Sequence, residues 1–336
     1  MIRSAAVLWV AALAMAIGVF AQAPDTPIAH KYVAVNDVRL HYATVGRGPL
    51  MLFLHGFPEF WYEWKNQLVE FGRDHMAVAP DMRGYNLSSK PQELSAYAVP
   101  QLVEDIRALV AELSKDVECP SGPPTPSAAN RSAACPRVIV AHDWGGAVAW
   151  VFAALHPDLV DKLVIINAPH PTVFGRELRD NPQQQQASQY MLLFRAPDAE
   201  STLSANNYAA LVTAILGEGL KNGTVTDDDK AAYLAAWSQP GALTGGLNYY
   251  RASGIGPPKP GEPPNDLLAQ PLIVRVPTLV IWGEKDTALL TGNLDGLDQF
   301  VKPLTIQRVP DGSHWVVHEK PALVIRYMRD FLKSGT

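Results

Sequence analysis

The chain has 336 residues, of which 48% are hydrophobic and 18% are charged, and its formal net charge is −5. This length allows one large core, or a core domain that carries an insertion. A mildly acidic chain without a Lys/Arg-rich run gives no basis for nucleic-acid binding, so we expect a soluble globular protein.

The N-terminus predicts an export signal. Met1-Ile2-Arg3 supplies a short positive start, the apolar run AAVLWVAALAMAIGVF follows, and Ala21-Gln22-Ala23 offers a small-x-small cleavage site. The run is short for a membrane span, and an uncleaved anchor is the alternative. We expect a signal peptide over residues 1–23, a secreted or periplasmic protein, and no stable membrane span in the mature chain.

From residue 31, short apolar runs alternate with helical periods, which is typical of a mostly parallel sheet covered by helices on both faces. KYVAVNDVRLHYATVG predicts a hairpin that turns at Asn36-Asp37. Six further apolar runs each lead into a polar loop: PLMLFLHGF, HMAVAPDMRG, RVIVAHDWGG, KLVIINAP, VPTLVIWGEKD and LTIQRVPDGSHW. Amphipathic stretches such as VPQLVEDIRALVAELS and PALVIRYMRDFLK predict helices.

The two cysteines, Cys119 and Cys135, bracket a loop-like stretch. Export permits a disulfide between them, and closing a loop of this size stabilises the fold by roughly 3 kcal/mol in the chain-entropy model. Two unpaired thiols are the alternative. Two sulfurs without a neighbouring histidine argue against a metal site, and we expect none in this protein.

The alternation of apolar runs with helical periods stops between about residues 172 and 270. This segment is rich in Gln, Asn, Ala and Pro and contains helix-like pieces, among them YAALVTAILGEGL and DDDKAAYLAAWSQ, but no convincing strand. It predicts a helical insertion between the sixth and seventh strands, closed by the stiff connector GIGPPKPGEPPND. The expected organisation is therefore a core of residues 24–171, a helical cap of residues 172–270, and the rest of the core in residues 271–336.

Polar groups follow several of the predicted strands, where catalytic groups collect in doubly wound sheets. The segment Ala141-His142-Asp143-Trp144-Gly145 has the small residues that a sharp strand-to-helix turn needs, with Asp143 where G-x-S-x-G places serine. Asp286 and His314 follow two later strands, so nucleophile, acid and histidine come in the order of an α/β-hydrolase. An isolated aspartate after a strand is more often a cap or surface group, and it is the ordered set that indicates a catalytic site.

The sequence resembles the epoxide hydrolase branch of the α/β-hydrolase superfamily over nearly all of the mature chain. The motifs that carry the resemblance are HGFPEFWYEW (55–64), DMRGYNLSSKP (81–91), HDWGG (142–146), GEKD (283–286) and GSHW (312–315). The resemblance implies an α/β-hydrolase fold, with a doubly wound, mostly parallel sheet and an inserted helical cap. Haloalkane and haloacid dehalogenases share these motifs.

An aspartate at the turn suits displacement at a saturated carbon, because an ionised carboxylate can attack that carbon and form an alkyl-enzyme ester. His314 would then act as general base on the water that hydrolyses the ester, with Asp286 as the charge-relay acid. By resemblance, the backbone N–H groups of Phe57 and Trp144 form the oxyanion hole. Some secreted relatives take the relay acid from the loop that here carries Asn167. An asparagine cannot carry the charge, which favours Asp286, and Glu284 is the alternative.

Opening an epoxide also creates an alkoxide that needs hydrogen-bond donors. Epoxide hydrolases resemble one another in using two cap tyrosines for this, and QYMLLFRAPD and LNYYRASG point to Tyr190 and Tyr250. Tyr249 is the alternative in the second stretch, and packing of the cap core is the alternative role for all three.

We therefore expect a hydrolase acting on ether bonds that needs no cofactor and opens a small hydrophobic epoxide with water to a vicinal diol. A haloalkane dehalogenase is the first alternative, and it would need a second indole or amide N–H beside Trp144 for the halide. A non-catalytic ligand-binding protein on the same fold is the second. The sequence leaves the substrate open, and also whether the protein is a homodimer.

Overall fold

The computed structural model describes residues 27–117, 136–258 and 269–334. The predicted signal peptide over residues 1–23, the pair Cys119 and Cys135, and most of the Pro/Gly connector lie outside these residues. Within the described ranges, no helix combines the length and the apolar character needed to cross a membrane.

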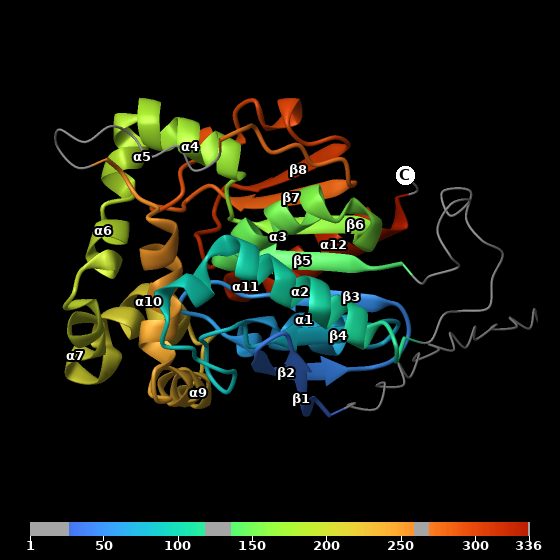
Figure 1. Ribbon diagram of the computed structural model, residues 1–336, viewed down its shortest axis with the longest axis horizontal. Coiled ribbons are helices and arrows are strands. Elements are labelled where there is room, and N and C mark those ends of the chain that lie inside the picture. The colour runs from blue at the N-terminus through green and yellow to red at the C-terminus, as the bar shows by residue number, and fades with distance from the viewer. Residues whose placement is uncertain (1–26, 118–135, 259–268, 335–336) are drawn as a thin grey trace, which may run out of the picture.

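An eight-stranded sheet forms the centre of the molecule (Figure 1). Its order is β1-β2-β4-β3-β5-β6-β7-β8, and only β1–β2 and β2–β4 pair antiparallel. The hairpin turns at Asn36-Asp37, where Val35 pairs with Val38. The doubly wound, mostly parallel sheet is therefore confirmed. The strands are β1 (Ala29–Val35), β2 (Val38–Val45), β3 (Leu50–Leu54), β4 (Met76–Pro80), β5 (Val138–His142), β6 (Lys162–Ile166), β7 (Thr278–Gly283) and β8 (Leu304–Val309).

Helices cover both faces of this sheet and one of its ends. The α-helices are α1 (Lys65–Phe71), α2 (Val99–Leu113), α3 (Asp143–Leu155), α4 (Pro171–Asp180), α5 (Pro182–Ala187), α6 (Tyr190–Arg195), α7 (Ala199–Leu211), α8 (Gly217–Asn222), α9 (Asp227–Trp237), α10 (Ala242–Ser253), α11 (Val316–Glu319) and α12 (Pro321–Lys333). A π-helical turn, η5 (Val212–Leu216), joins α7 to α8. Short 3₁₀ turns are η1 (Trp61–Trp64), η2 (Leu94–Tyr97), η4 (Pro157–Leu159), η6 (Thr291–Leu294) and η7 (Leu297–Gln299).

The strand β3 shows how the sheet divides the core. Leu50, Leu52 and Leu54 point to the face covered by α2 and α3, and the intervening Met51 and Phe53 point to the face covered by α1 and α12. Successive side chains of a strand alternate between faces, so a strand buried on both sides must be apolar throughout. This is why the strands are continuous apolar runs in the sequence.

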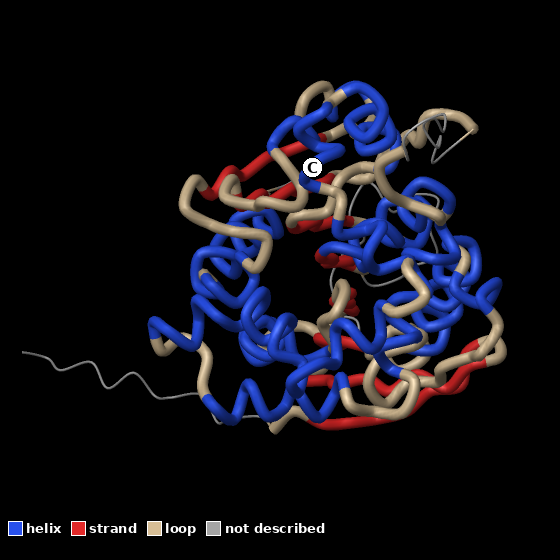
Figure 2. Tube along the Cα trace, turned by 90° about the vertical axis from the view of Figure 1, so that its left-hand side faces the viewer, coloured by secondary structure: helices blue, strands red, loops and turns tan. Residues whose placement is uncertain are grey.

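The helices α4 to α10 follow β6 and precede β7, and they lie over the end of the sheet at which the parallel strands terminate (Figures 1 and 2). The described part of this segment contains no strand. One helix in it is interrupted, because Asn206, Asn207 and Tyr208 in α7 have left-handed backbone angles with φ of 51°, 56° and 61°. The segment places helical side chains directly above the loops that leave the strands.

Candidate active site

Asp143 stands at the turn from β5 into α3. Its φ is +47°, in the left-handed region that costs a residue with a side chain of order 1–3 kcal/mol. The turn is as tight as the sequence predicts, because a Cβ on Gly145 would lie 2.3 Å from the Leu54 carbonyl oxygen, and one on Gly146 would lie 2.2 Å from the Ala168 Cβ. The sharp turn carries the Asp143 carboxylate beyond the end of the sheet.

The loop after β3 closes over this carboxylate. The Phe57 backbone N–H donates to Asp143 Oδ1 at 2.8 Å, and the close approach requires Gly56, whose Cβ would lie 2.3 Å from the Asp143 Cβ. The Trp144 N–H lies in the first turn of α3, where an amide has no acceptor within its helix. His55 supports the loop from its buried side, with its Nδ1 2.9 Å from the Gly56 carbonyl oxygen. The two predicted oxyanion-hole residues therefore flank Asp143.

His314 links the two predicted aspartates. Its Nδ1 donates to Asp286 Oδ2 at 2.7 Å, and its Nε2 lies 3.8 Å from Asp143 Oδ2. The other oxygen of Asp286 accepts from the backbone N–H groups of Ala288 and Leu289 at 2.8 and 2.9 Å. Although burial raises the pKa of Asp286, the charge of His314 and these hydrogen bonds outweigh it and leave the pKa below its usual value. Asp286 is therefore ionised at neutral pH.

Two further residues settle which acid faces His314. Asn167, at the position where some relatives carry the acid, donates through Nδ2 to Asp286 Oδ2 at 2.9 Å and accepts from the Gly283 N–H at 2.8 Å. Glu284 instead pairs with Arg308 at 2.9 Å, with the Arg308 side chain 47% exposed. Asp286 is the acid in contact with His314, and Asn167 holds it in place.

The charge on His314 is set by the carboxylates around it. Burial alone lowers the pKa of an imidazole, but Asp286, Asp143 and Glu63 together outweigh burial and raise the pKa of His314 to about 9. A carboxylate that loses its charge therefore lowers this pKa again.

Glu63 and His142 form a buried pair behind His314 that sequence reasoning missed. His142 Nε2 lies 2.9 Å from the His314 carbonyl oxygen, and its Nδ1 lies 2.5 Å from Glu63 Oε1. Burial raises the pKa of Glu63 well above its usual value and lowers that of His142 to about 4. Burial therefore opposes a charge on either member of this pair. The only sequence signal was the second glutamate of HGFPEFWYEW.

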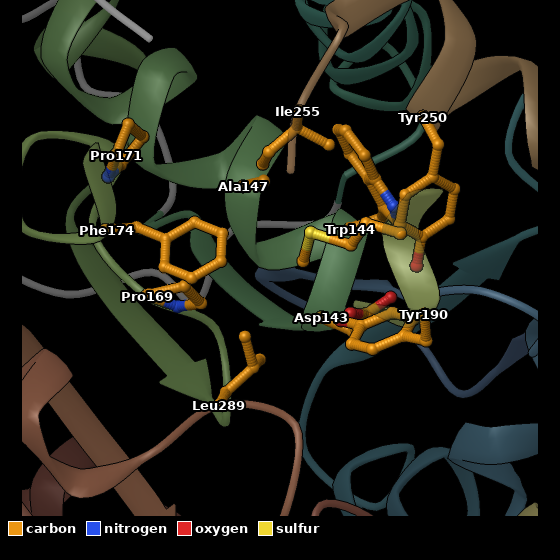
Figure 3. A pocket seen from close by; sticks show the side chains of 11 residues that line it. Asp143, Trp144, Ala147, Pro169, Pro171, Phe174, Tyr190, Tyr250, Ile255 and Leu289 are labelled. Atoms are coloured by element: carbon orange, nitrogen blue, oxygen red, sulfur yellow. The ribbon is translucent and has the colours of Figure 1, made fainter. Parts of the chain in front are cut away.

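Tyr190 and Tyr250 line the same cavity as Asp143, and the hydroxyl of Tyr250 points toward the carboxylate (Figure 3). Tyr190 begins α6, Tyr250 lies on α10, and their ring centres are 6.4 Å apart. Burial, and next the charge of Asp143, raises the pKa of each tyrosine well above its usual value. Both phenols therefore keep their protons at neutral pH and can donate hydrogen bonds into the cavity.

Tyr249 faces another way. Its buried hydroxyl donates to the Arg83 carbonyl oxygen at 2.8 Å, which ties α10 to the loop after β4. Of the two neighbouring tyrosines, Tyr250 is the one that reaches the cavity.

The rest of this cavity is apolar. Its volume is about 60 Å³, and among the described residues that line it Asp143 is the only charged one. Of the lining residues within the described ranges, Trp144 alone has a side-chain N–H. The remaining lining residues are Ala147, Pro169, Pro171, Phe174, Met191, Ile255 and Leu289. Among the residues that the structure describes, no group of three or more His, Cys, Asp or Glu side chains is arranged to hold a metal ion.

Comparisons with known proteins agree with this geometry. A family model described as "Alpha/beta hydrolase family" matches residues 51–327. The chain is 37% identical over 310 residues to the AB hydrolase superfamily protein YfhM of Bacillus subtilis, covering 90% of this chain and 98% of that protein. It is 35% identical over 314 residues to epoxide hydrolase 2 of Caenorhabditis elegans, covering 91% and 81%. A crystal structure of Bacillus megaterium epoxide hydrolase with an inhibitor is 37% identical, with a TM-score of 0.77 and coverage of 90% and 100%.

Proposed function

The chain belongs to the epoxide hydrolase branch of the α/β-hydrolase family, and we propose that it opens an epoxide through a covalent ester on Asp143. The observation that carries this proposal is the placement of two protonated phenols, Tyr190 and Tyr250, in one cavity with a carboxylate. A carboxylate can attack the epoxide carbon, and the phenols can donate to the oxygen that leaves it.

In the first half-reaction, Asp143 Oδ2 forms a bond to an epoxide carbon and the bond from that carbon to the ring oxygen breaks. The Phe57 N–H holds Oδ1, which leaves Oδ2 as the attacking atom. The electron pair of the broken bond goes to the ring oxygen, which takes a proton from Tyr250 or Tyr190. The products are a hydroxyalkyl ester of Asp143 and a tyrosinate that water reprotonates.

In the second half-reaction, water attacks Cγ of the ester and gives its proton to His314 Nε2. The ester no longer carries the charge of Asp143, one of the groups that raise the pKa of His314. Forming the ester therefore lowers this pKa and favours the neutral imidazole, which is the form that can accept a proton from water. The Phe57 and Trp144 N–H groups stabilise the oxyanion, at roughly 2.7–4 kcal/mol for each donor. Collapse releases the diol oxygen, which takes the proton from His314, and leaves a carboxylic acid on Asp143. This acid loses the second proton of the attacking water to solvent, which replaces the proton that the tyrosinate took up and restores the Asp143 carboxylate.

Trapping the ester tests the mechanism. A His314→Gln variant incubated with styrene oxide should gain the mass of one epoxide on the peptide that contains Asp143, because the ester forms and water is not activated. An Asp143→Asn variant is the matched control and should gain nothing. Diol formation by His314→Gln at the native rate, without added mass, would refute the mechanism.

The two alternatives make different predictions in the same assay. A haloalkane dehalogenase needs two N–H donors for the halide, and among the residues lining the described cavity only Trp144 has one in its side chain. Release of halide from short haloalkanes without diol formation from epoxides would favour it. A non-catalytic binding protein would form no ester in any variant.

The finer expectations from the sequence remain proposals. The apolar lining of the cavity supports a small hydrophobic epoxide as the substrate. We also propose export after removal of residues 1–23, a Cys119–Cys135 disulfide, and a cap over residues 172–270. Intact mass of the secreted protein before and after reduction tests the cleavage and the disulfide together, and its molar mass in solution tests for a homodimer.

A further inference from the structure

A second cavity adjoins His314 and shares no lining residue with the cavity around Asp143. We call the first the aspartate cavity and the second the histidine cavity. The histidine cavity has a volume of about 200 Å³ and lies between the cap, from Ala214 to Val225, and the loops that carry Lys285 and His314. His314 thus lies between Asp143 and a separate space.

The two cavities differ in chemistry. Apart from Asp143, the hydroxyls of the two tyrosines and the Trp144 N–H, the aspartate cavity is apolar. The lining of the histidine cavity, in contrast, includes Lys285, Ser313, His318 and Glu319. A water molecule needs roughly 10–15 Å³ of such volume and two to four polar partners. The histidine cavity therefore has both the room and the polar groups for several water molecules.

A smaller polar cavity of about 30 Å³ continues from this one. The two share Thr224, Val225 and His318, and the smaller cavity is also lined by Lys65 and Asp229. The cavities together outline a polar route between the cap and the core that ends at His314.

The hydrolysis step needs such a route. Once the ester has formed, its alkyl group occupies the aspartate cavity, whose lining is largely apolar. The attacking water must give its proton to His314 Nε2, since Nδ1 is bonded to Asp286. We infer that the hydrolytic water reaches the ester through the histidine cavity, while the epoxide enters and is held in the aspartate cavity. This inference rests on the proposed ester mechanism.

Filling the histidine cavity from the cap tests the inference. Ala214 is exposed, lies on η5 and lines the histidine cavity, and the reaction proposed above assigns it no role. Ala214→Phe should slow breakdown of the ester by about tenfold, a rise of ~1.4 kcal/mol in the barrier, with Ala214→Leu in between. Because ester formation precedes the blocked step, kcat and KM should fall together and kcat/KM should stay unchanged.

The control is Thr213→Phe, which adds the same ring to the neighbouring exposed residue that does not line the cavity. It should break down the ester at the native rate, and thermal unfolding should show both variants folded. Unchanged ester breakdown in Ala214→Phe would overturn the inference, because water would then arrive elsewhere. Slower ester formation with a lower kcat/KM would also overturn it, by showing that the cavity admits the epoxide. Absence of any ester in the native enzyme would instead refute the proposed mechanism itself.

Discussion

Single residues decide the first half-reaction through the two phenols that face Asp143. Tyr250→Phe removes one of two donors to the opening ring oxygen, and acid catalysis of this kind contributes about 10²–10⁴-fold in all. With Tyr190 retained, we expect ester formation to slow by about ten- to a hundredfold in single-turnover measurements.

The neighbouring tyrosine supplies the control. Tyr249→Phe removes only the hydrogen bond to the Arg83 carbonyl oxygen, so it should lower the free energy of unfolding by about 1 kcal/mol and leave ester formation nearly native. If Tyr249→Phe slowed the ester step as much as Tyr250→Phe, the assignment of donors would be wrong.

The pH dependence of ester breakdown follows from the protonation of His314. A protonated imidazole cannot accept a proton from water, so breakdown should be slow at low pH, rise with pH and then level off. The pKa of His314 is about 9 in the free enzyme, and loss of the Asp143 charge in the ester lowers it, so the midpoint should lie below 9. Single-turnover decay across pH 5 to 10 measures it, and a rate independent of pH would exclude His314 as the base.

Sequence motifs predicted Asp143, Asp286, His314, Tyr190 and Tyr250, and the structure brings these five together around one site. Each lies in a short stretch whose local pattern carries its chemistry. The supporting contacts were not predictable, because Glu63 and His142 meet only where three distant segments of the chain pack behind His314. The sequence around Glu63 gives no sign that its partner is His142, because the two residues are far apart in the chain.

The position of helix α10 determines where the Tyr250 side chain lies relative to Asp143. Gly245 on this helix packs against the loop after β4, and a Cβ there would lie 2.3 Å from the Gly84 carbonyl oxygen. Gly245→Ala must therefore push α10 away from the core, and such overpacking costs about 1–3 kcal/mol. We expect a lower free energy of unfolding in urea and a lower kcat/KM, because Tyr250 moves with the helix.

A second cap glycine separates this effect from the general effect of adding a methyl group. Gly217 begins α8 with helical backbone angles, and its nearest atoms to an added Cβ are at 3.9 and 4.0 Å. Gly217→Ala should therefore stabilise the protein by about 0.5–1 kcal/mol without changing kcat/KM. Equal losses of activity in the two variants would contradict the proposed role of the contact between α10 and the loop.

The strands were predictable because each buried strand is a continuous apolar run ending in a polar loop. The cap was predictable only as a helical segment. Its interruption at Asn206–Tyr208 was not, since asparagine tolerates left-handed angles but the following tyrosine gives no such signal.

For the whole molecule, two buried histidines predict a loss of stability in acid. Burial lowers the pKa of His142 and of His170 to about 4. An unfolded histidine takes up its proton near pH 6.5, so between about pH 6.5 and 4 the unfolded state binds more protons and the free energy of unfolding falls as the pH falls. Each of these two pKa shifts corresponds to roughly 3 kcal/mol in the free energy of unfolding.

His170 allows this to be tested without disturbing the site. Its ring stacks on Phe300 and meets Trp150 edge-on, and neither ring nitrogen has a hydrogen-bond partner among the described residues. His170→Phe keeps the ring packing, so the difference in free energy of unfolding between pH 7.5 and pH 4.5 should shrink by up to roughly 3 kcal/mol. Urea denaturation at the two pH values measures it, and an unchanged difference would show that His170 is not held neutral.

The origin of the oxygen in the diol tests the central claim most directly. In a single turnover in ¹⁸O-water with enzyme in excess, water attacks Cγ of the ester, so we predict that the label enters the side chain of Asp143 and that the diol carries none. Mass spectrometry of the peptide that contains Asp143 and of the diol reads out both. Label in the diol with none on Asp143 would show that water opens the epoxide directly, and would contradict the covalent mechanism.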